Sequence, residues 1–175
     1  MCARSNLKRD IGNKLRFQRA EVDCFSTEKP DSEFNSRRIF KPTVLLTDIY
    51  TSQWNDTRKV VVDHMWVHMY HHMMSLNLHI GDCISFTGRP LKYEKPVSGK
   101  VILEIGIDTI FNVTFLSRPN IDKYEYSFDY YLEQMIWDKT MMVSDLYLQY
   151  YYKHIAKHKN HQILKLDASD ISNRR

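Results

Sequence analysis

Glycine and proline are scarce in this sequence, with only five of each among 175 residues. So few glycines argue against a glycine-rich nucleotide-binding fold, and neither a P-loop nor a dinucleotide-binding motif is present. Long apolar runs are also missing, since none approaches the roughly 18 residues of a membrane span. The first ten residues lack the apolar stretch of a secretory signal. We therefore expect a protein that does not enter the membrane.

Cysteine is nearly absent as well. The three cysteines (Cys2, Cys24 and Cys83) are odd in number and widely spaced, and no CxxC pair occurs. This pattern does not predict a disulfide framework, and it fits a reducing cytoplasm best.

Aromatic residues are abundant, at 13%, and the chain carries a net charge of +4. The charge is uneven: residues 1–20 hold six cations and one anion, and residues 153–175 hold six cations and two anions, whereas residues 121–152 hold six acids and two lysines. Basic ends attract phosphate backbones by releasing counterions. The alternative is that the terminal lysines only keep the chain soluble.

Alternating apolar residues predict five strands, over residues 14–25, 43–50, 59–69, 83–87 and 101–116, the last with a bulge near residues 106–108. Polar, turn-rich stretches at 26–38, 51–58 and 94–100 predict loops. A short helical turn is expected within residues 70–79. Five strands with one short helix between the third and fourth follow the order of an OB-fold barrel.

Residues 122–161 contain neither glycine nor proline and carry apolar residues at helical spacings, which predicts one or two helices with a break near residues 138–141. The predicted fold class is therefore α+β: a five-stranded OB-like β-barrel followed by a C-terminal α-helical extension. The predicted organisation is a flexible basic arm (1–13), the barrel (14–119), the extension (120–161) and a flexible tail (162–175).

Several short motifs follow one another in a characteristic order: Thr-Val-Leu-Leu-Thr-Asp-Ile at 43–49, Asp-His-Met-Trp at 63–66, Gly-Asp at 81–82, Tyr-Glu-Lys at 93–95 and Leu-Ser-Arg-Pro at 116–119. Over about residues 15–119 the chain resembles a group of small OB-like proteins from phages and mobile elements of Gram-positive bacteria. The resemblance implies an OB-like fold and a place in the host bacterial cytoplasm. It implies no particular activity, because the function of that group is largely unassigned.

Aromatic rings next to cations suit single-stranded nucleic acid, since bases stack on rings and phosphates pair with Lys or Arg. Trp54 is the sharpest candidate, because it lies in a predicted hairpin tip; the alternative is that it packs on the C-terminal helices. Trp66 is expected in the core. The predicted nucleic-acid-binding residues are Arg16, Phe17, Arg19, Arg37, Arg38, Lys41, Trp54, Arg58, Lys92, Tyr93 and Lys95.

Tyrosines gather in the second half of the extension. On a helix Tyr147, Tyr150 and Tyr151 share one face, with Lys153 and Lys157 close by. Two interpretations stay open: this face docks the helix on the barrel, or it is a protein interface, since interface cores are enriched in Tyr and Met.

A run of histidines between His64 and His72 raises the question of a metal site. On a strand, residues four apart lie too far from each other to chelate closely, and no cysteine has the spacing to complete a zinc site. A strand followed by a turn would still allow His68, His71 or His72 to come together, and a His-coordinated metalloprotein is the third and weakest hypothesis. We predict no metal and no cofactor. The sequence also lacks the common hydrolase, kinase and metalloprotease motifs, so no catalytic residue is predicted and the protein is expected to be non-enzymatic.

The leading hypothesis is a nucleic-acid-associated binding protein of a phage or mobile element, which contacts single-stranded DNA or RNA or a nucleoprotein complex. The alternative is a protein-binding inhibitor or adaptor, such as an anti-CRISPR or other counter-defence factor, that uses the C-terminal helices.

Overall fold

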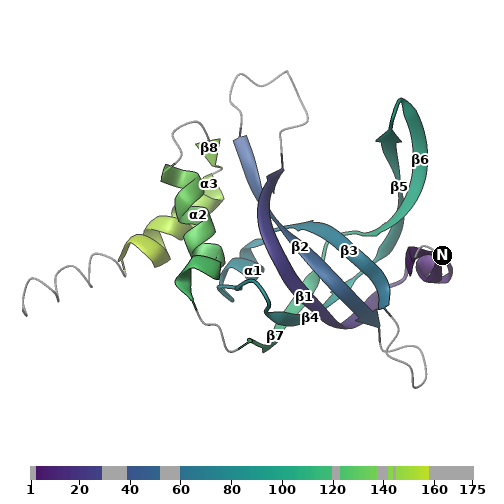
Figure 1. Cartoon of the computed structure of the whole chain (residues 1–175), viewed down its shortest axis with the longest axis horizontal. Coiled ribbons are helices and arrows are strands. Elements are labelled where there is room, and N and C mark those ends of the chain that lie inside the picture. The colour runs from purple at the N-terminus through teal and green to yellow at the C-terminus, as the bar shows by residue number, and fades with distance from the viewer. Residues whose placement is uncertain are drawn as a thin grey trace, which may run out of the picture.

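The described part of the chain is built around one main β-sheet with helices at its two ends (Figure 1). The computed structural model describes residues 3–28, 39–51, 60–119, 123–137, 142–143 and 145–157. The fold is mixed α+β and consists mostly of strands. The main sheet has the strand order β3 (Val60–His68), β2 (Ile39–Thr51), β1 (Leu15–Glu28), β4 (Cys83–Gly88) and β7 (Phe111–Ser117), and the short strand β8 (Met142–Val143) runs parallel to the start of β2.

The long first strand organises this sheet. β1 pairs antiparallel with β2 along one edge and with β4 along the other, and shifts in register mark irregularities on both sides. Its alternating apolar residues Leu15, Phe17, Ala20 and Val22 are buried, as the pattern predicts. The Phe17 ring stacks on the Phe86 ring of β4 with centroids 4.8 Å apart. The core of the sheet therefore forms where β1 and β4 meet.

The predicted barrel is not confirmed, because the sheet is open. Its two outer strands are β3 and β7, and in the part of the chain that the structure describes they do not pair with each other. The predicted single strand over residues 101–116 is in fact two strands. The chain leaves the first at Asp108, whose N–H donates to the Arg89 carbonyl at 2.8 Å, and buries Ile110 before β7 begins.

The segment between β4 and β7 forms a separate two-stranded hairpin, which we call the arm. β5 (Pro90–Val97) pairs with β6 (Lys100–Ile107), and the arm projects from the main sheet (Figure 1). Most of the predicted loop over residues 94–100 belongs to these strands, and the turn itself is short. Ser98 and Gly99, at the turn, have positive φ values of 49° and 78°. Two left-handed residues in a row are the geometry of a two-residue hairpin turn whose twist matches that of the strands.

The N-terminal segment is helical, which differs from the predicted flexible N-terminal extension over residues 1–13. Ala3–Asp10 forms the 3-10 helix η1, and Leu7 is buried. One apolar side chain in an otherwise charged stretch gave no period in the sequence, yet it anchors η1 against β3 and the base of the arm.

The remaining helices gather at the opposite end of the sheet (Figure 1). They are α1 (His71–Met74), the short 3-10 helix η2 (Tyr124–Tyr126), α2 (Phe128–Trp137), α3 (Asp145–Tyr150) and the π-helical turn η3 (Tyr151–Ile155). α2 ends just before the predicted break at 138–141, and that break lies outside the described residues. Phe25 on β1 contacts Phe128 and Tyr131 of α2, with ring centroids 5.6 and 5.8 Å apart. Within the described residues, no helix is long and apolar enough to cross a membrane.

Candidate functional site

Trp66 is the exposed aromatic residue at the edge of the main sheet. Its neighbours Met65 and Val67 are buried, whereas 49% of Trp66 is accessible to solvent. The expectation that Trp66 belongs to the core is therefore wrong. The period of two along β3 gives the inner positions to Met65, Val67 and Met69, so the indole is left on the outer face.

Two adjoining hollows flank Trp66, and Ile107 and Asp108 line both of them. The one toward the arm has a volume of about 450 Å³ and is lined by Tyr93, Lys95 and Gly106. The other has a volume of about 390 Å³ and continues to Thr43 and Tyr70. We call the two together the Trp66 groove. It lies between β3 on one side and the arm with the 107–110 segment on the other.

Tyr93 forms part of the arm wall of this groove and is held in a defined position. A Cβ atom at Gly106 would lie 2.9 Å from the Tyr93 ring, so the absence of a side chain there lets the ring lie against the backbone. The Tyr93 hydroxyl donates a hydrogen bond to Glu104 Oε2 at 2.7 Å, and Lys95 Nζ lies 3.4 Å from Glu104 Oε1. The arm therefore presents an aromatic ring and an ammonium group side by side.

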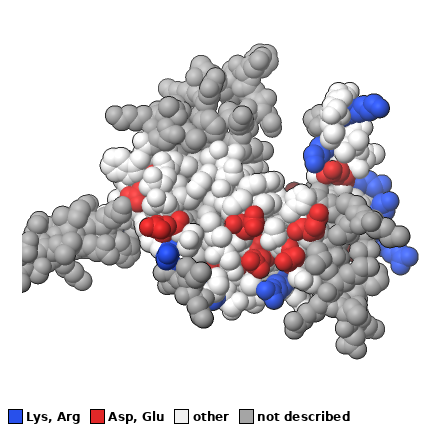
Figure 2. Space-filling model, viewed as in Figure 1, with Lys and Arg blue, Asp and Glu red and all other residues white. Residues whose placement is uncertain are grey.

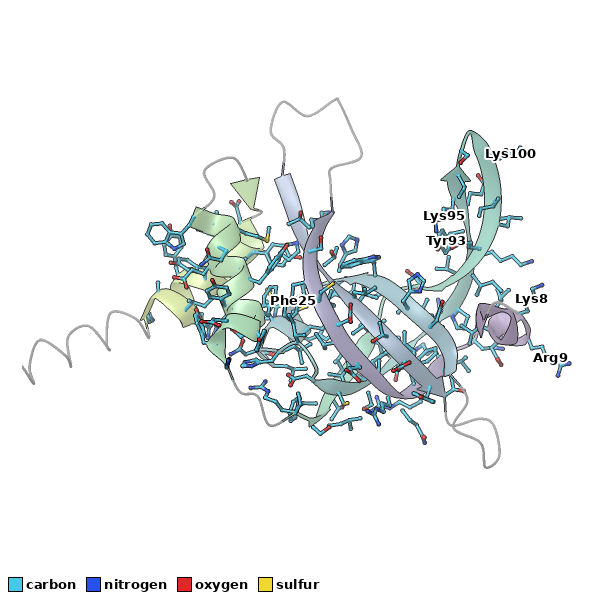
Figure 3. All side chains as sticks on the ribbon, in the orientation of Figure 1. Lys8, Arg9, Phe25, Tyr93, Lys95 and Lys100 are labelled. Atoms are coloured by element: carbon cyan, nitrogen blue, oxygen red, sulfur yellow. The ribbon has the colours of Figure 1, made fainter. Side chains whose placement is uncertain are left out.

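Charge divides the surface into an acidic and a basic region. Figure 2 shows acidic side chains gathered over the main sheet and cations on the side of the arm, and Asp23, Asp48 and Asp63 are exposed on β1, β2 and β3. Figure 3 shows Lys95 and Lys100 on the arm and Lys8 and Arg9 on η1 beside its base. A polyanion is therefore repelled from the open face of the sheet and attracted to the arm.

The structure separates the predicted nucleic-acid-binding residues. Tyr93 and Lys95 line the Trp66 groove from β5, whereas Lys92 lies on the opposite face of the same strand. Arg16 instead bridges two strands, since its guanidinium donates to Ser85 Oγ at 2.6 Å and to the Asn112 carbonyl at 2.9 Å. Arg19 is exposed on β1 and Lys41 is exposed on β2, so neither joins the cluster on the arm. The predicted residues outside the described part of the chain are Arg37, Arg38, Trp54 and Arg58.

Phe17 has to be removed from the predicted set. Its side chain is fully buried against Phe86, so neither face of the ring is open to a base. The adjacent Arg16 and Arg19 suggested a stacking site, but alternation turns Phe17 inward and Arg16 outward, and a shift in register after Phe17 leaves Arg19 exposed as well.

The predicted tyrosine interface is also buried. Tyr147, Tyr150 and Tyr151 are at most 8% exposed. The Tyr147 hydroxyl donates to the Met69 carbonyl at 3.0 Å, and the Tyr150 hydroxyl lies 2.8 Å from the Met74 carbonyl. Of the two interpretations, docking of the helix on the body of the protein is confirmed for these three residues. Lys153 and Lys157 remain exposed beside them.

The histidine run does not form a cluster. Among the described residues, no three His, Cys, Asp or Glu side chains are close enough to hold one metal ion. His64 instead contacts its neighbour Asp63, with Nδ1 and Oδ2 3.1 Å apart. His72 stacks on Tyr70, and partial burial together with the adjacent His71 lowers the His72 pKa.

Sequence reasoning missed the two features that define the groove, the exposed Trp66 and the projecting arm. The alternation of Met65, Val67 and Met69 opposite His64, Trp66 and His68 was a signal for the first. The pair Ser98-Gly99 between two β-rich runs was a signal for the second.

Comparison of the chain with protein-family models, with curated proteins and with solved structures gives no match. The resemblance to OB-like proteins of phages and mobile elements therefore stays a prediction. The site has to be interpreted from its own residues.

Proposed function

We propose that this protein binds single-stranded nucleic acid in the Trp66 groove, without catalysing a reaction. The observation that carries the proposal is the exposed indole of Trp66 opposite a wall that holds Tyr93 and Lys95. Proteins that bind single strands combine aromatic rings, on which bases stack, with cations that follow the backbone. The groove offers both kinds of group.

The strand order supports an OB-like ancestry for this groove. β1 pairs with both β2 and β4, a short helix lies between β3 and β4, and the outer strands are β3 and β7. The same strand order occurs in a five-stranded OB barrel, and we take it as support for the proposal although the outer strands of this sheet do not pair. OB-folds bind oligonucleotides over their second and third strands and the loop between the fourth and fifth strands. The arm occupies the position of that loop.

The charge distribution supports a definite path for the strand. Acidic residues over the main sheet repel phosphates, and the cations of the arm and of η1 attract them. We therefore propose that the bases face Trp66 and Tyr93 while the phosphates run on the side of Lys95.

A titration of the purified full chain with fluorescently labelled single strands tests this proposal. Oligonucleotides of about 16 nucleotides, as DNA and as RNA, are long enough to fill the site of one OB-fold. We expect an increase in anisotropy at low salt, quenching of tryptophan fluorescence, and weaker binding as salt rises. No binding at about 50 mM salt would contradict the proposal.

A protein partner is the second candidate function, in the role of an inhibitor or adaptor such as an anti-CRISPR or other counter-defence factor. Trp137 of α2 is 68% exposed, and Tyr152 of η3 is also exposed. Large aromatic side chains in contact with solvent are typical anchors of interfaces. Loss of a partner from pull-downs with Trp137→Ala, but not with Trp66→Ala, would favour this function over nucleic-acid binding.

A further inference from the structure

The outer edge of the arm is a strand without a neighbour. Within the described residues, β6 pairs only with β5, in a sheet of two strands. Near the tip of the arm, Val101 is 65% and Leu103 is 71% exposed, and Ile102 and Val97 are exposed as well. An isolated hairpin is marginally stable in water, and an exposed apolar strand edge is a template for pairing with another strand. We therefore expect this edge to pair with another strand.

We propose that β6 pairs antiparallel with β6 of a second copy of this chain, about a twofold axis at Ile102. In this register Val101 lies opposite Leu103 of the second copy, and Lys100 lies opposite Glu104 of the second copy. The twofold axis repeats each of these pairs. The interface thus holds three apolar pairs, including Ile102 opposite Ile102 on the axis, and two pairs of opposite charge, and it is self-complementary as an isologous dimer requires.

The direction of the backbone groups agrees with this register. Pro96 pairs with Val101 in the hairpin. Because Pro96 has no N–H, this is a pair that does not exchange hydrogen bonds, and the N–H and C=O groups of Val101 point away from β5. The same holds two residues further along, at Leu103. In the proposed register these are the residues that would exchange hydrogen bonds with the second copy.

Neighbouring registers are less favourable. An axis at Leu103 would place Ile102 opposite Glu104 and Lys100 opposite Gly106, which pairs apolar with charged side chains. An axis at Val101 would place Lys100 opposite Ile102. An axis between two residues would place a residue whose backbone N–H and C=O point toward the second copy opposite a residue whose N–H and C=O point toward β5. These two residues could not exchange hydrogen bonds. Charge complementarity therefore selects the axis at Ile102.

Space for a second strand is present at the tip. Figure 1 shows that η1 lies beside the base of the arm and that the tip stands clear of it. Ile105, near the base, is buried, whereas residues 101–103 are exposed. A second copy can therefore reach the edge of β6 at its tip. This pairing does not require bound nucleic acid, although Glu104 takes part in both features, because it also accepts the Tyr93 hydroxyl in the wall of the Trp66 groove.

Sedimentation equilibrium of the full chain over a range of concentrations tests the proposal. We expect a reversible monomer–dimer equilibrium. Lys100→Glu and Glu104→Lys each place like charges opposite each other twice, and each should weaken the dimer about tenfold or more. An equimolar mixture of the two variants should regain wild-type association. In the mixed dimer, both charged positions of one strand are acidic and both of the other strand are basic, so each pair across the axis again joins a carboxylate to an ammonium group.

Lys92→Glu is the matched control, because it makes the same change of charge on β5, away from the β6 edge. It should leave the equilibrium unchanged. Leu103→Lys should abolish the dimer, and circular dichroism checks that the chain keeps its fold. A wild-type chain that stays monomeric at all concentrations overturns the proposal. Dimers that the single variants do not weaken, or that the mixture does not restore, overturn the register.

Discussion

Arg118 and Asp82 join the end of β7 to the turn that leads into β4. The guanidinium of Arg118 approaches the carboxylate side-on, with Nε 2.9 Å from Oδ1 and Nη2 3.0 Å from Oδ2. Asp82 is fully buried, and its Oδ2 also accepts the N–H of His79 at 2.7 Å. Arg118 Nη2 also donates to the Asn77 carbonyl at 3.1 Å. The two sequence motifs Gly-Asp and Leu-Ser-Arg-Pro are therefore in contact.

Replacing Arg118 by Met should lower the free energy of unfolding by about 3–5 kcal/mol, because Asp82 would be left as a buried charge without its cation. Urea unfolding followed by circular dichroism measures the loss. Lys95→Met is the control, since its contact with Glu104 is exposed and such pairs contribute about 1 kcal/mol or less. The double variant Asp82→Asn with Arg118→Met should lose less than Arg118→Met alone. A loss from Arg118→Met as small as the control's would contradict a structural role for the pair.

Trp66→Ala should weaken the binding of single strands by about 1–3 kcal/mol, if a base stacks on the indole. Anisotropy titrations at fixed salt measure this change. Because half of Trp66 is buried, its replacement should also lower the urea midpoint, so circular dichroism first establishes that the variant is folded under the titration conditions. Trp137→Ala removes an exposed indole on α2 instead and is the matched control. Equal affinities of the two variants for the same oligonucleotide would remove the Trp66 groove as the binding site.

The salt dependence of binding reports on the cations of the arm. Each phosphate contact on a single strand contributes about 0.7 to the slope of log K against log salt. Lys95→Ala should therefore make the slope shallower by up to about 0.7, with a similar loss for DNA and RNA. Lys153→Ala, an exposed lysine of η3, should leave the slope unchanged. If both variants gave the same slope, the phosphates would run elsewhere.

Local pattern was enough to predict most strands of this protein. The buried residues of β1 alternate, and the short helix between β3 and β4 falls where its sequence places it. The closed barrel could not be predicted, because closure depends on whether β3 reaches β7. That distance is a property of the tertiary arrangement, which no period in the sequence reports.

The candidate site was predictable only in part, for a related reason. Lys92, Tyr93 and Lys95 are neighbours in the sequence and remain neighbours on the arm. Trp66 meets them only through the tertiary arrangement, and Phe17 was misassigned because adjacent cations do not reveal which side of a strand a ring faces. The hydroxyls of Tyr147 and Tyr150 likewise meet the backbone carbonyls of Met69 and Met74, which a sequence does not place.

Alkaline pH should destabilise the docking of the helices on the sheet. Burial raises the pKa of Tyr131 to about 12, and burial together with Asp129 raises the pKa of Tyr150. The folded state thus favours the neutral phenols, whereas the unfolded chain releases these protons near the usual pKa of about 10. The stabilisation is complete below about pH 10 and is lost as the pH rises through the folded pKa values.

Urea unfolding at intervals between about pH 8 and 12 checks this expectation. Tyr131→Phe should show a shallower decline than the wild type above about pH 10, because its ring has no proton to lose. Tyr150→Phe should also decline less steeply, but it starts about 1 kcal/mol lower at neutral pH, since its hydrogen bond to the Met74 carbonyl is gone. Tyr152→Phe, exposed on η3, is the control and should follow the wild type. If the free energy of unfolding fell equally with pH in the wild type and in all three Tyr→Phe variants, groups other than Tyr131 and Tyr150 would control the alkaline transition.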